Sequence, residues 1–144
     1  MGVLYDYFVA ASDDEAASMI EDGPDGELLV LELKGLDPLR LVDVESLLTG
    51  VSLNAICERA PFLRVIAALN NDHQLVLSLN DKLRDALARA TAEELTAVAA
   101  PWAETTGCVQ QEDIDALKDL LREFAMLARE ARADRAHLYC WVCV

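Results

Sequence analysis

The sequence predicts an α+β fold in which a small sheet of about three strands is packed by about four to five helices. Apolar segments rich in β-branched, aromatic or leucine residues indicate strands at 2–10, 27–34 and 136–144. The segment 112–133 repeats apolar residues at helical spacing, which indicates a long amphipathic helix. No linker, internal repeat or low-complexity tract divides the chain, so 1–144 is expected to form a single domain.

The first strand is followed by a helix with recognisable ends. Ser12 and Glu15 form a capping box, in which each side chain accepts a hydrogen bond from a free backbone N–H. The helix is expected over 13–22 and is ended by Pro24, because proline cannot continue it. The near-continuous apolar character of 27–34 then predicts a strand covered on both faces.

The middle of the chain begins with two helices. Asp37 and Pro38 indicate an N-cap followed by proline at the first helical position, and the apolar stripe after them ends at Gly50. Ser52 is expected to cap a further short helix.

The segment 75–90 allows two interpretations. Leu75, Leu77 and Leu79 recur at every second position as in a strand, but the whole segment also fits a helix of about five turns. The helix is favoured because one pattern then explains the whole stretch.

The C-terminal part has the clearest pattern. Thr91 and Glu94 form a second capping box, and the helix that they open is expected to be interrupted near Pro101. The helix 112–133 has acidic residues in its first turn and arginines at its end, which complements the helix dipole. The strand 136–144 has two apolar faces, so we expect it inside the sheet with a neighbour on each side.

The charge of the chain is strongly negative and uneven. The net charge is −14, and residues 1–60 hold 13 acids against 3 basic residues, so this part is the acidic pole. Such a field repels phosphate backbones and anionic lipid, so neither a nucleic-acid partner nor a membrane is expected. Two explanations of the acidic surface stay open: solubility alone, or a basic protein partner.

The sequence also predicts the cellular location of the protein. No apolar stretch reaches the roughly 20 residues needed to cross a bilayer. The first residues show neither the basic region nor the cleavage site of a secretory signal. A cytoplasmic location is therefore expected, in which cysteines stay reduced, and Cys57 and Cys108 are expected to pack as small apolar residues.

Both ends of the chain resemble one family. Met1 to Phe8 precede a capped acidic helix, and Phe124 to Arg135 lead into the apolar strand His137 to Val144. In this the chain resembles the YfbM-like family of uncharacterised bacterial proteins. The resemblance implies an α+β fold in which strands from the two termini meet in one small sheet, and it implies no catalytic residues, ligands or cofactor.

Cys140 and Cys143 have the spacing of a redox pair, which works when one thiol is held as a low-pKa thiolate. On a strand, however, they point to opposite faces. We therefore predict that they form neither a redox pair nor half of a zinc site. The remaining candidate zinc ligands show no second paired spacing, so no metal and no cofactor are expected; these candidates are Cys57, Cys108, His73 and His137.

The acidic turn 21–27 has some features of a calcium loop. Asp25, Gly26 and Glu32 could occupy positions five, six and twelve of an EF-hand, but the third position would fall on Gly23, which lacks a ligand oxygen. A solvated turn is the favoured interpretation.

Asp72 and His73 could form an acid–base pair. The polar run around them is more typical of capping and of the protein surface at the start of the helix expected there, so the structural interpretation is favoured.

No sequence motif identifies an activity. The nucleophile elbow, the phosphate-binding loop, the dinucleotide-binding glycines and the zinc-protease motif are absent from the sequence. The leading hypothesis is a non-enzymatic binding or regulatory protein with an acidic N-terminal surface. The alternative is a small enzyme whose site is assembled from scattered residues, which needs a concave pocket with converging polar groups and perturbed titration.

Large aromatic residues are the best candidates for an interface. Trp102, Tyr139 and Trp141 could anchor one if they are exposed, because rigid aromatics dominate binding hot spots. Buried aromatics are the commoner case.

Overall fold

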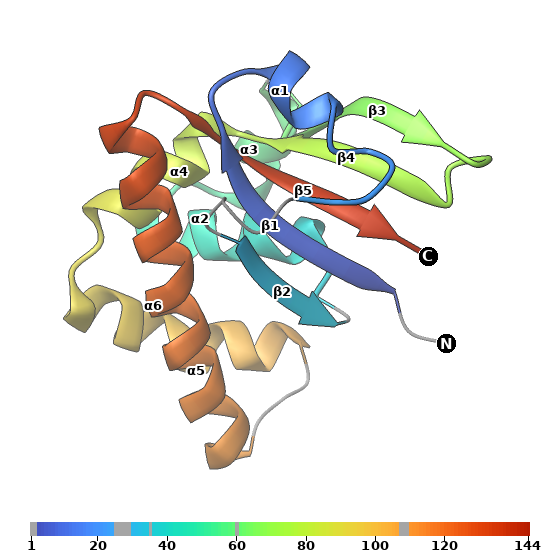
Figure 1. Ribbon diagram of the computed structural model, residues 1–144. Coiled ribbons are helices and arrows are strands. Elements are labelled where there is room, and N and C mark those ends of the chain that lie inside the picture. Colours follow the sequence, from blue (N-terminus) through green and yellow to red (C-terminus); the bar gives the residue numbers. More distant parts are fainter. Residues whose placement is uncertain (1–2, 25–29, 35, 60, 107–109) are drawn as a thin grey trace.

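The computed structural model describes residues 3–24, 30–34, 36–59, 61–106 and 110–144. Within this part of the chain, five strands form one sheet and six α-helices surround it (Figure 1). The predicted α+β class is confirmed, while the expected numbers of about three strands and four to five helices were too low.

The sheet is antiparallel between all neighbouring strands, in the order β2-β1-β5-β4-β3. The strand bounds are β1 Leu4–Ala10, β2 Val30–Lys34, β3 Leu63–Leu69, β4 Gln74–Leu79 and β5 His137–Cys143. The C-terminal strand β5 lies between β1 and β4, so the prediction of an inner strand with two neighbours is confirmed. The strand β2 is at the sheet edge. Leu31 and Val30 pack against the cores on the two faces, but Glu32 is exposed, so the expected cover on both faces holds for only part of this strand.

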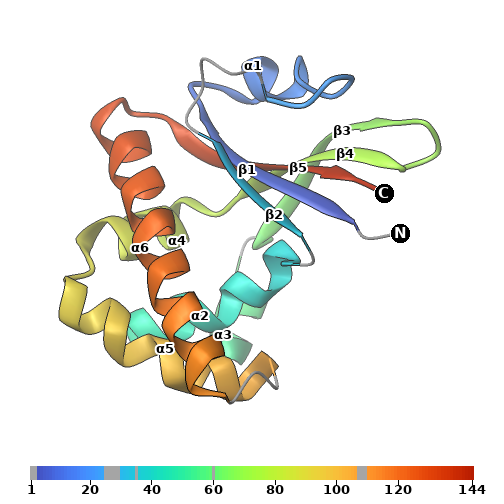
Figure 2. The same cartoon turned by 60° about the horizontal axis from the view of Figure 1, so that its bottom comes forward.

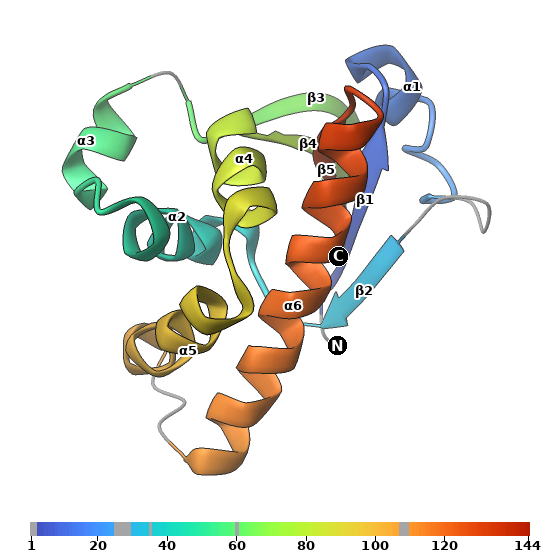
Figure 3. The ribbon, with the colours of Figure 1, turned by 90° about the vertical axis from the view of Figure 1, so that its left-hand side faces the viewer.

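The helices are distributed unequally over the two faces of the sheet. Figures 2 and 3 show α1 on one side of the strands and the other helices on the opposite side. The helix bounds are α1 Asp13–Ala17, α2 Leu41–Thr49, α3 Leu53–Glu58, α4 Asp81–Arg89, α5 Ala92–Thr106 and α6 Gln111–Ala133, and a short 3₁₀ helix, η1, covers Pro38–Arg40.

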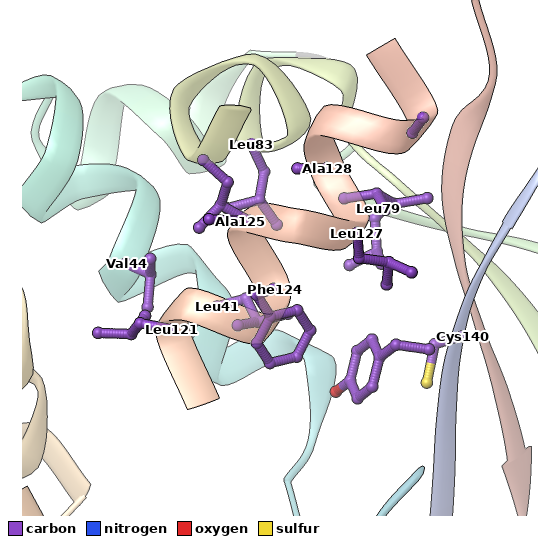
Figure 4. Close-up of a cluster of buried hydrophobic side chains, with 14 of the residues drawn as sticks. Leu41, Val44, Leu79, Leu83, Leu121, Phe124, Ala125, Leu127, Ala128 and Cys140 are labelled. Atoms are coloured by element: carbon purple, nitrogen blue, oxygen red, sulfur yellow. The ribbon is translucent and has the colours of Figure 1, made fainter. Parts of the chain in front are cut away.

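The helix α6 fills the space between the sheet and the other helices. Its apolar face carries Phe124 and Leu127, which Figure 4 shows directed towards Leu41 of α2, Leu79 of β4 and Cys140 of β5. Each of these five side chains is almost completely buried, and burial of one such side chain contributes roughly 1.5–3 kcal/mol. The amphipathic pattern found in the sequence therefore forms the main core of the protein.

The other face of the sheet has a smaller core under α1 and the segment after it. Trp141 donates a hydrogen bond from Nε1 to the carbonyl of Ile20 at 3.0 Å, and Gln74 donates from Nε2 to the carbonyl of Glu21 at 2.8 Å. These bonds hold the segment that follows α1 against the strands, over Phe8. The predicted helix over 13–22 ends at Ala17, because the chain then turns to lay Met19 and Ile20 on the sheet.

The predicted helix over 75–90 was wrong in its first half. Residues 63–69 and 74–79 form the hairpin of β3 and β4, and α4 begins only at Asp81, after the N-cap Asn80. The leucines at every second position of 75–79 belong to the strand β4, and β4 is covered on both faces, so Val76 is buried as well.

The helix α5 continues through Pro101, so the predicted interruption did not occur. Pro101 itself is exposed, while its neighbours Trp102 and Ala103 are completely buried. The packing of these neighbours stabilises the turn that proline alone would weaken. The predicted capping box of Thr91 and Glu94 is present, and Ser12 caps α1 as predicted, while the Glu15 carboxylate accepts from the N–H of Ala11 instead of that of Ser12.

Candidate functional site

A cavity of about 540 Å³ lies where α1, β3, β4, α4 and β5 meet. In Figure 1 these elements converge in the upper part of the molecule. The polar groups of its lining come from separate parts of the chain, and they are Ser12, Asp13, Asp14, Arg64, Ser78, Asn80, Asp81 and His137. The cavity is therefore a concave polar site assembled from scattered residues, which the alternative functional hypothesis requires.

His137 and Asp81 form a hydrogen-bonded pair in this lining. Nδ1 of His137 is 2.7 Å from Oδ1 of Asp81, and both side chains are about half-buried. His137 is the first residue of β5, and Asp81 is the first residue of α4. The pair is therefore held between the end of a strand and the start of a helix, where Asn80 caps α4 by accepting a hydrogen bond from the N–H of Lys82 at 2.7 Å.

Arg84 contacts the Asp81 carboxylate and the backbone next to His137. Its Nη1 donates to the carbonyl of Ala136 at 2.8 Å and lies 3.3 Å from Oδ1 of Asp81. Nη1 is also 3.5 Å from Nδ1 of His137, which is too long for a good hydrogen bond. Nδ1 therefore donates its proton to Asp81, and in the neutral ring Nε2 is the unprotonated nitrogen.

A row of polar side chains lies along the floor of the cavity. In the register of the sheet, Arg64 of β3 lies opposite Ser78 of β4, which lies opposite Tyr139 of β5. Asp13 of α1 joins the two ends of this row. Its Oδ1 accepts from the Tyr139 hydroxyl at 2.8 Å, and its Oδ2 accepts from Nη2 of Arg64 at 3.2 Å.

The hydrogen bond between Tyr139 and Asp13 shifts the pKa values of both side chains. The hydrogen bond from Tyr139 is the main cause that lowers the pKa of Asp13, and Arg64 adds to it against the opposing effect of burial. Burial, followed by the hydrogen bond to Asp13, raises the pKa of Tyr139. Asp13 therefore stays a carboxylate and Tyr139 stays a hydrogen-bond donor over the physiological range.

The three aromatic residues considered for an interface are all buried. Trp102 lies in the helical layer and donates from Nε1 to the carbonyl of Arg40 at 3.1 Å, and Trp141 packs under the segment after α1. Tyr139 is buried as well, but its hydroxyl reaches Asp13 at the cavity. The exposure on which the interface hypothesis depended is not observed for any of them.

The cysteines lie as the strand geometry predicted. Cys140 is buried in the core on the helical side of the sheet, while Cys143 packs on the opposite face. Burial raises the pKa of the Cys140 thiol, which makes it a poor nucleophile. Cys57 is exposed on α3, so its expected packing as a small apolar residue was wrong, and Cys108 lies outside the described residues.

The other sequence candidates do not join the cavity. Asp72 and His73 lie in the turn between β3 and β4 rather than at a helix start, so the capping interpretation was wrong. Asp25 and Gly26 of the acidic turn lie outside the described residues, and Glu32 is on β2. Among the residues that the structure describes, no three His, Cys, Asp or Glu side chains converge as metal ligands would.

Sequence reasoning missed Asp13, Arg64 and Asp81 as site residues. Asp13 and Asp81 each directly follow an N-capping residue, which was a visible signal for their position at a helix start. Arg64 carried no comparable signal, because its neighbours in the site come from another strand and from α1.

Comparisons of the chain with models of protein families, with curated proteins and with solved structures gave no match. The kinship with the YfbM-like family stays a prediction. In the part of the chain that the structure describes, no helix has the length and apolar character to span a membrane.

Proposed function

We propose that this protein is a small enzyme that performs acid–base chemistry on a small polar molecule bound in the cavity. The observation that carries this proposal is the 2.7 Å contact between His137 and Asp81 within the lining of a cavity of about 540 Å³. Histidine is the side chain used most often in general acid–base catalysis, and a carboxylate on one ring nitrogen fixes its orientation and tautomer.

In the proposed reaction, Nε2 of His137 accepts a proton from the bound molecule or from a water. Nε2 has no hydrogen-bond partner among the described residues, whereas Nδ1 is held by Asp81. The Asp81 carboxylate stabilises the imidazolium that forms, and it keeps the ring in the tautomer that can accept the proton. Arg84 holds the Asp81 carboxylate in place.

The two serines of the lining do not suit a covalent mechanism. Ser78 is buried and accepts a hydrogen bond from Arg64, and the hydroxyl of Ser12 caps α1 through the N–H of Glu15. Within the described structure, neither hydroxyl is hydrogen-bonded to His137, as an activated serine would have to be. We therefore propose direct proton transfer rather than a seryl intermediate.

The test is a screen of small polar metabolites for products formed by the wild-type protein, by His137→Gln and by Asp81→Asn. We expect a reaction that His137→Gln slows by about 10²–10⁴-fold. His73→Gln is the matched control, because His73 is exposed in the hairpin turn and lies outside the cavity lining. Equal turnover by wild type and His137→Gln, or no turnover by the wild type, would contradict the proposal.

The non-enzymatic binding or regulatory role expected from the sequence is the second candidate. In this role, the cavity binds a metabolite and does not convert it. The same screen separates the two, since a binder raises the unfolding temperature of the wild type with its ligand and forms no product. Together with this second candidate we propose a cytoplasmic location and a basic protein partner.

A further inference from the structure

Arg64 offers the cavity hydrogen-bond donors that nothing in the described structure uses. Its Nη2 lies 3.2 Å from Oδ2 of Asp13 and 3.3 Å from Oγ of Ser78. Its Nε and Nη1 have no partner among the described residues, and its side chain is 55% exposed. An arginine with free N–H groups presents a planar fork to an oxyanion.

The contacts of Nη2 with Asp13 and Ser78 orient the guanidinium of Arg64. Asp13 is itself held by the hydroxyl of Tyr139, and Ser78 is the cross-strand partner of Arg64 in the sheet. Ser78 is buried, and the half-exposed carboxylate of Asp13 is held by the buried Tyr139. Holding the side chain in one orientation reduces the entropy that a ligand would otherwise have to overcome on binding.

The charges around the cavity decide which oxyanion suits the site. Three aspartates contribute to the lining, and two of them already have cationic partners: Asp13 is paired with Arg64, and Asp81 with Arg84. Asp14 has no cationic partner among the described residues, and the whole chain is strongly acidic. Such surroundings disfavour a doubly charged phosphate more than a singly charged carboxylate.

We propose that the cavity takes a small molecule with a carboxylate group, which the guanidinium of Arg64 binds while His137 acts on another part of the same molecule. The inference deepens the proposed function and rests on it for the role of His137. The carboxylate-binding step itself is independent of any turnover.

The test is a titration with sodium acetate at constant ionic strength, followed by the backbone amide shifts of the cavity residues. We expect saturable shifts at Asp13, Asp14 and Ser78, and a loss of affinity of about tenfold or more in Arg64→Gln. Arg89→Gln is the matched control, because Arg89 is an exposed arginine at the end of α4 that lies outside the cavity lining. Inorganic phosphate and methylammonium, titrated in the same way, are expected to bind more weakly than acetate.

A second variant keeps the test decisive if Arg64→Gln does not fold. Asp14→Asn removes a negative charge of the lining and is expected to tighten acetate binding. The inference is overturned if acetate does not saturate, if it binds Arg64→Gln as tightly as the wild type, if methylammonium or phosphate binds better, or if Asp14→Asn weakens it. Acetate binding without any turnover would support the carboxylate-binding step and contradict both the proposed enzyme and the role of His137, whereas turnover of uncharged substrates alone would support the enzyme and contradict the carboxylate-binding step.

Discussion

The hydroxyl of Tyr139 donates a 2.8 Å hydrogen bond to Oδ1 of Asp13, across a sequence separation of 126 residues. The bond joins the inner strand β5 to the first turn of α1 and forms one end of the polar row on the cavity floor. It therefore links the stability of the fold to the shape of the candidate site.

Replacing Tyr139 with phenylalanine tests this link. The hydrogen bond lowers the pKa of Asp13, so its stabilisation is present above the unfolded-state pKa of Asp13 and is lost as the pH falls through the folded-state pKa. We expect Tyr139→Phe to lower the free energy of unfolding by about 1 kcal/mol at pH 7, since Asp13 is partly exposed, and by less near pH 2.

Urea unfolding at the two pH values measures this difference. Tyr5→Phe is the control, because the hydroxyl of Tyr5 has no described hydrogen bond to a carboxylate. The assignment is refuted if both variants lose the same stability at both pH values.

Asp6 and Glu32 place two carboxylates side by side on the sheet, at directly opposed positions of β1 and β2. Burial, followed by repulsion from Glu32, raises the pKa of Asp6. A raised folded-state pKa favours the folded protein below the unfolded-state pKa, and this advantage is lost as the pH rises through the folded-state pKa. Asp6→Asn should therefore stabilise the protein at pH 7 by about 0.5 kcal/mol, with a smaller gain near pH 3.

Chemical unfolding of Asp6→Asn at pH 7 and near pH 3 provides the measurement. Asp22→Asn serves as the control, because Asp22 is exposed after α1 and has no described side-chain partner. A loss of stability in Asp6→Asn at pH 7 would show that the carboxylate has a favourable partner instead.

Glu45 and Arg59 form an ion pair inside the helical layer. The side chain of Glu45 is completely buried, and Oε1 of Glu45 and Nε of Arg59 have no hydrogen-bond partner in the described structure. Removing one partner leaves an uncompensated buried charge, so Arg59→Met should lower the free energy of unfolding by about 3 kcal/mol.

The double variant Glu45→Met with Arg59→Met is the informative comparison. It should recover most of this loss, because two apolar side chains replace the pair without an isolated charge. Denaturant titration of the two single variants and the double variant measures the coupling. Additive losses would mean that the two groups do not interact.

Gly23 lies against the ring of Trp141 with a left-handed backbone, φ +81°. A Cβ atom at Gly23 would lie 3.1 Å from the Trp141 ring, whereas a Cβ at Gly50, φ +75°, would meet nothing within 4 Å. Gly50→Ala should therefore lower the free energy of unfolding by about 1 kcal/mol, because alanine disfavours the left-handed backbone. Gly23→Ala should lower it by ~1–2 kcal/mol more than Gly50→Ala, because its Cβ also crowds the Trp141 ring. Thermal unfolding of both variants checks this, and equal losses would argue against close packing of the segment after α1.

Local sequence patterns were enough to predict several elements. The two capping boxes depend on residues three positions apart, and the repeat of α6 depends on one helix face, so both were visible without knowing the fold. The two apolar faces of β5 predicted its inner position, and the alternation of side chains along a strand predicted the separation of Cys140 from Cys143.

The hairpin of β3 and β4 was missed because its decisive signal is in the turn. Asn70, Asn71 and Asp72 all adopt positive φ, which asparagine and aspartate tolerate better than other residues. That run could have identified a hairpin turn. The apparent helical pattern of 75–90 instead joined a strand to the start of α4, since apolar residues four apart share a face in both a strand and a helix.

The cavity could not be predicted because its parts meet only through the register of the sheet. Arg64 reaches Ser78 across the missed hairpin, and His137 reaches Asp81 only because β5 lies beside β4. Without the strand order, no spacing along the chain brings these side chains together.

The protonation of the His137 ring tests the central claim most directly. A long-range ¹H–¹⁵N spectrum of the two histidine rings, recorded where both are neutral, should show His137 protonated at Nδ1 and bare at Nε2, with exposed His73 as the internal reference. Asp81→Asn should abolish this preference. A wild-type His137 ring protonated at Nε2, or one unaffected by Asp81→Asn, would contradict the proposed acid–base site.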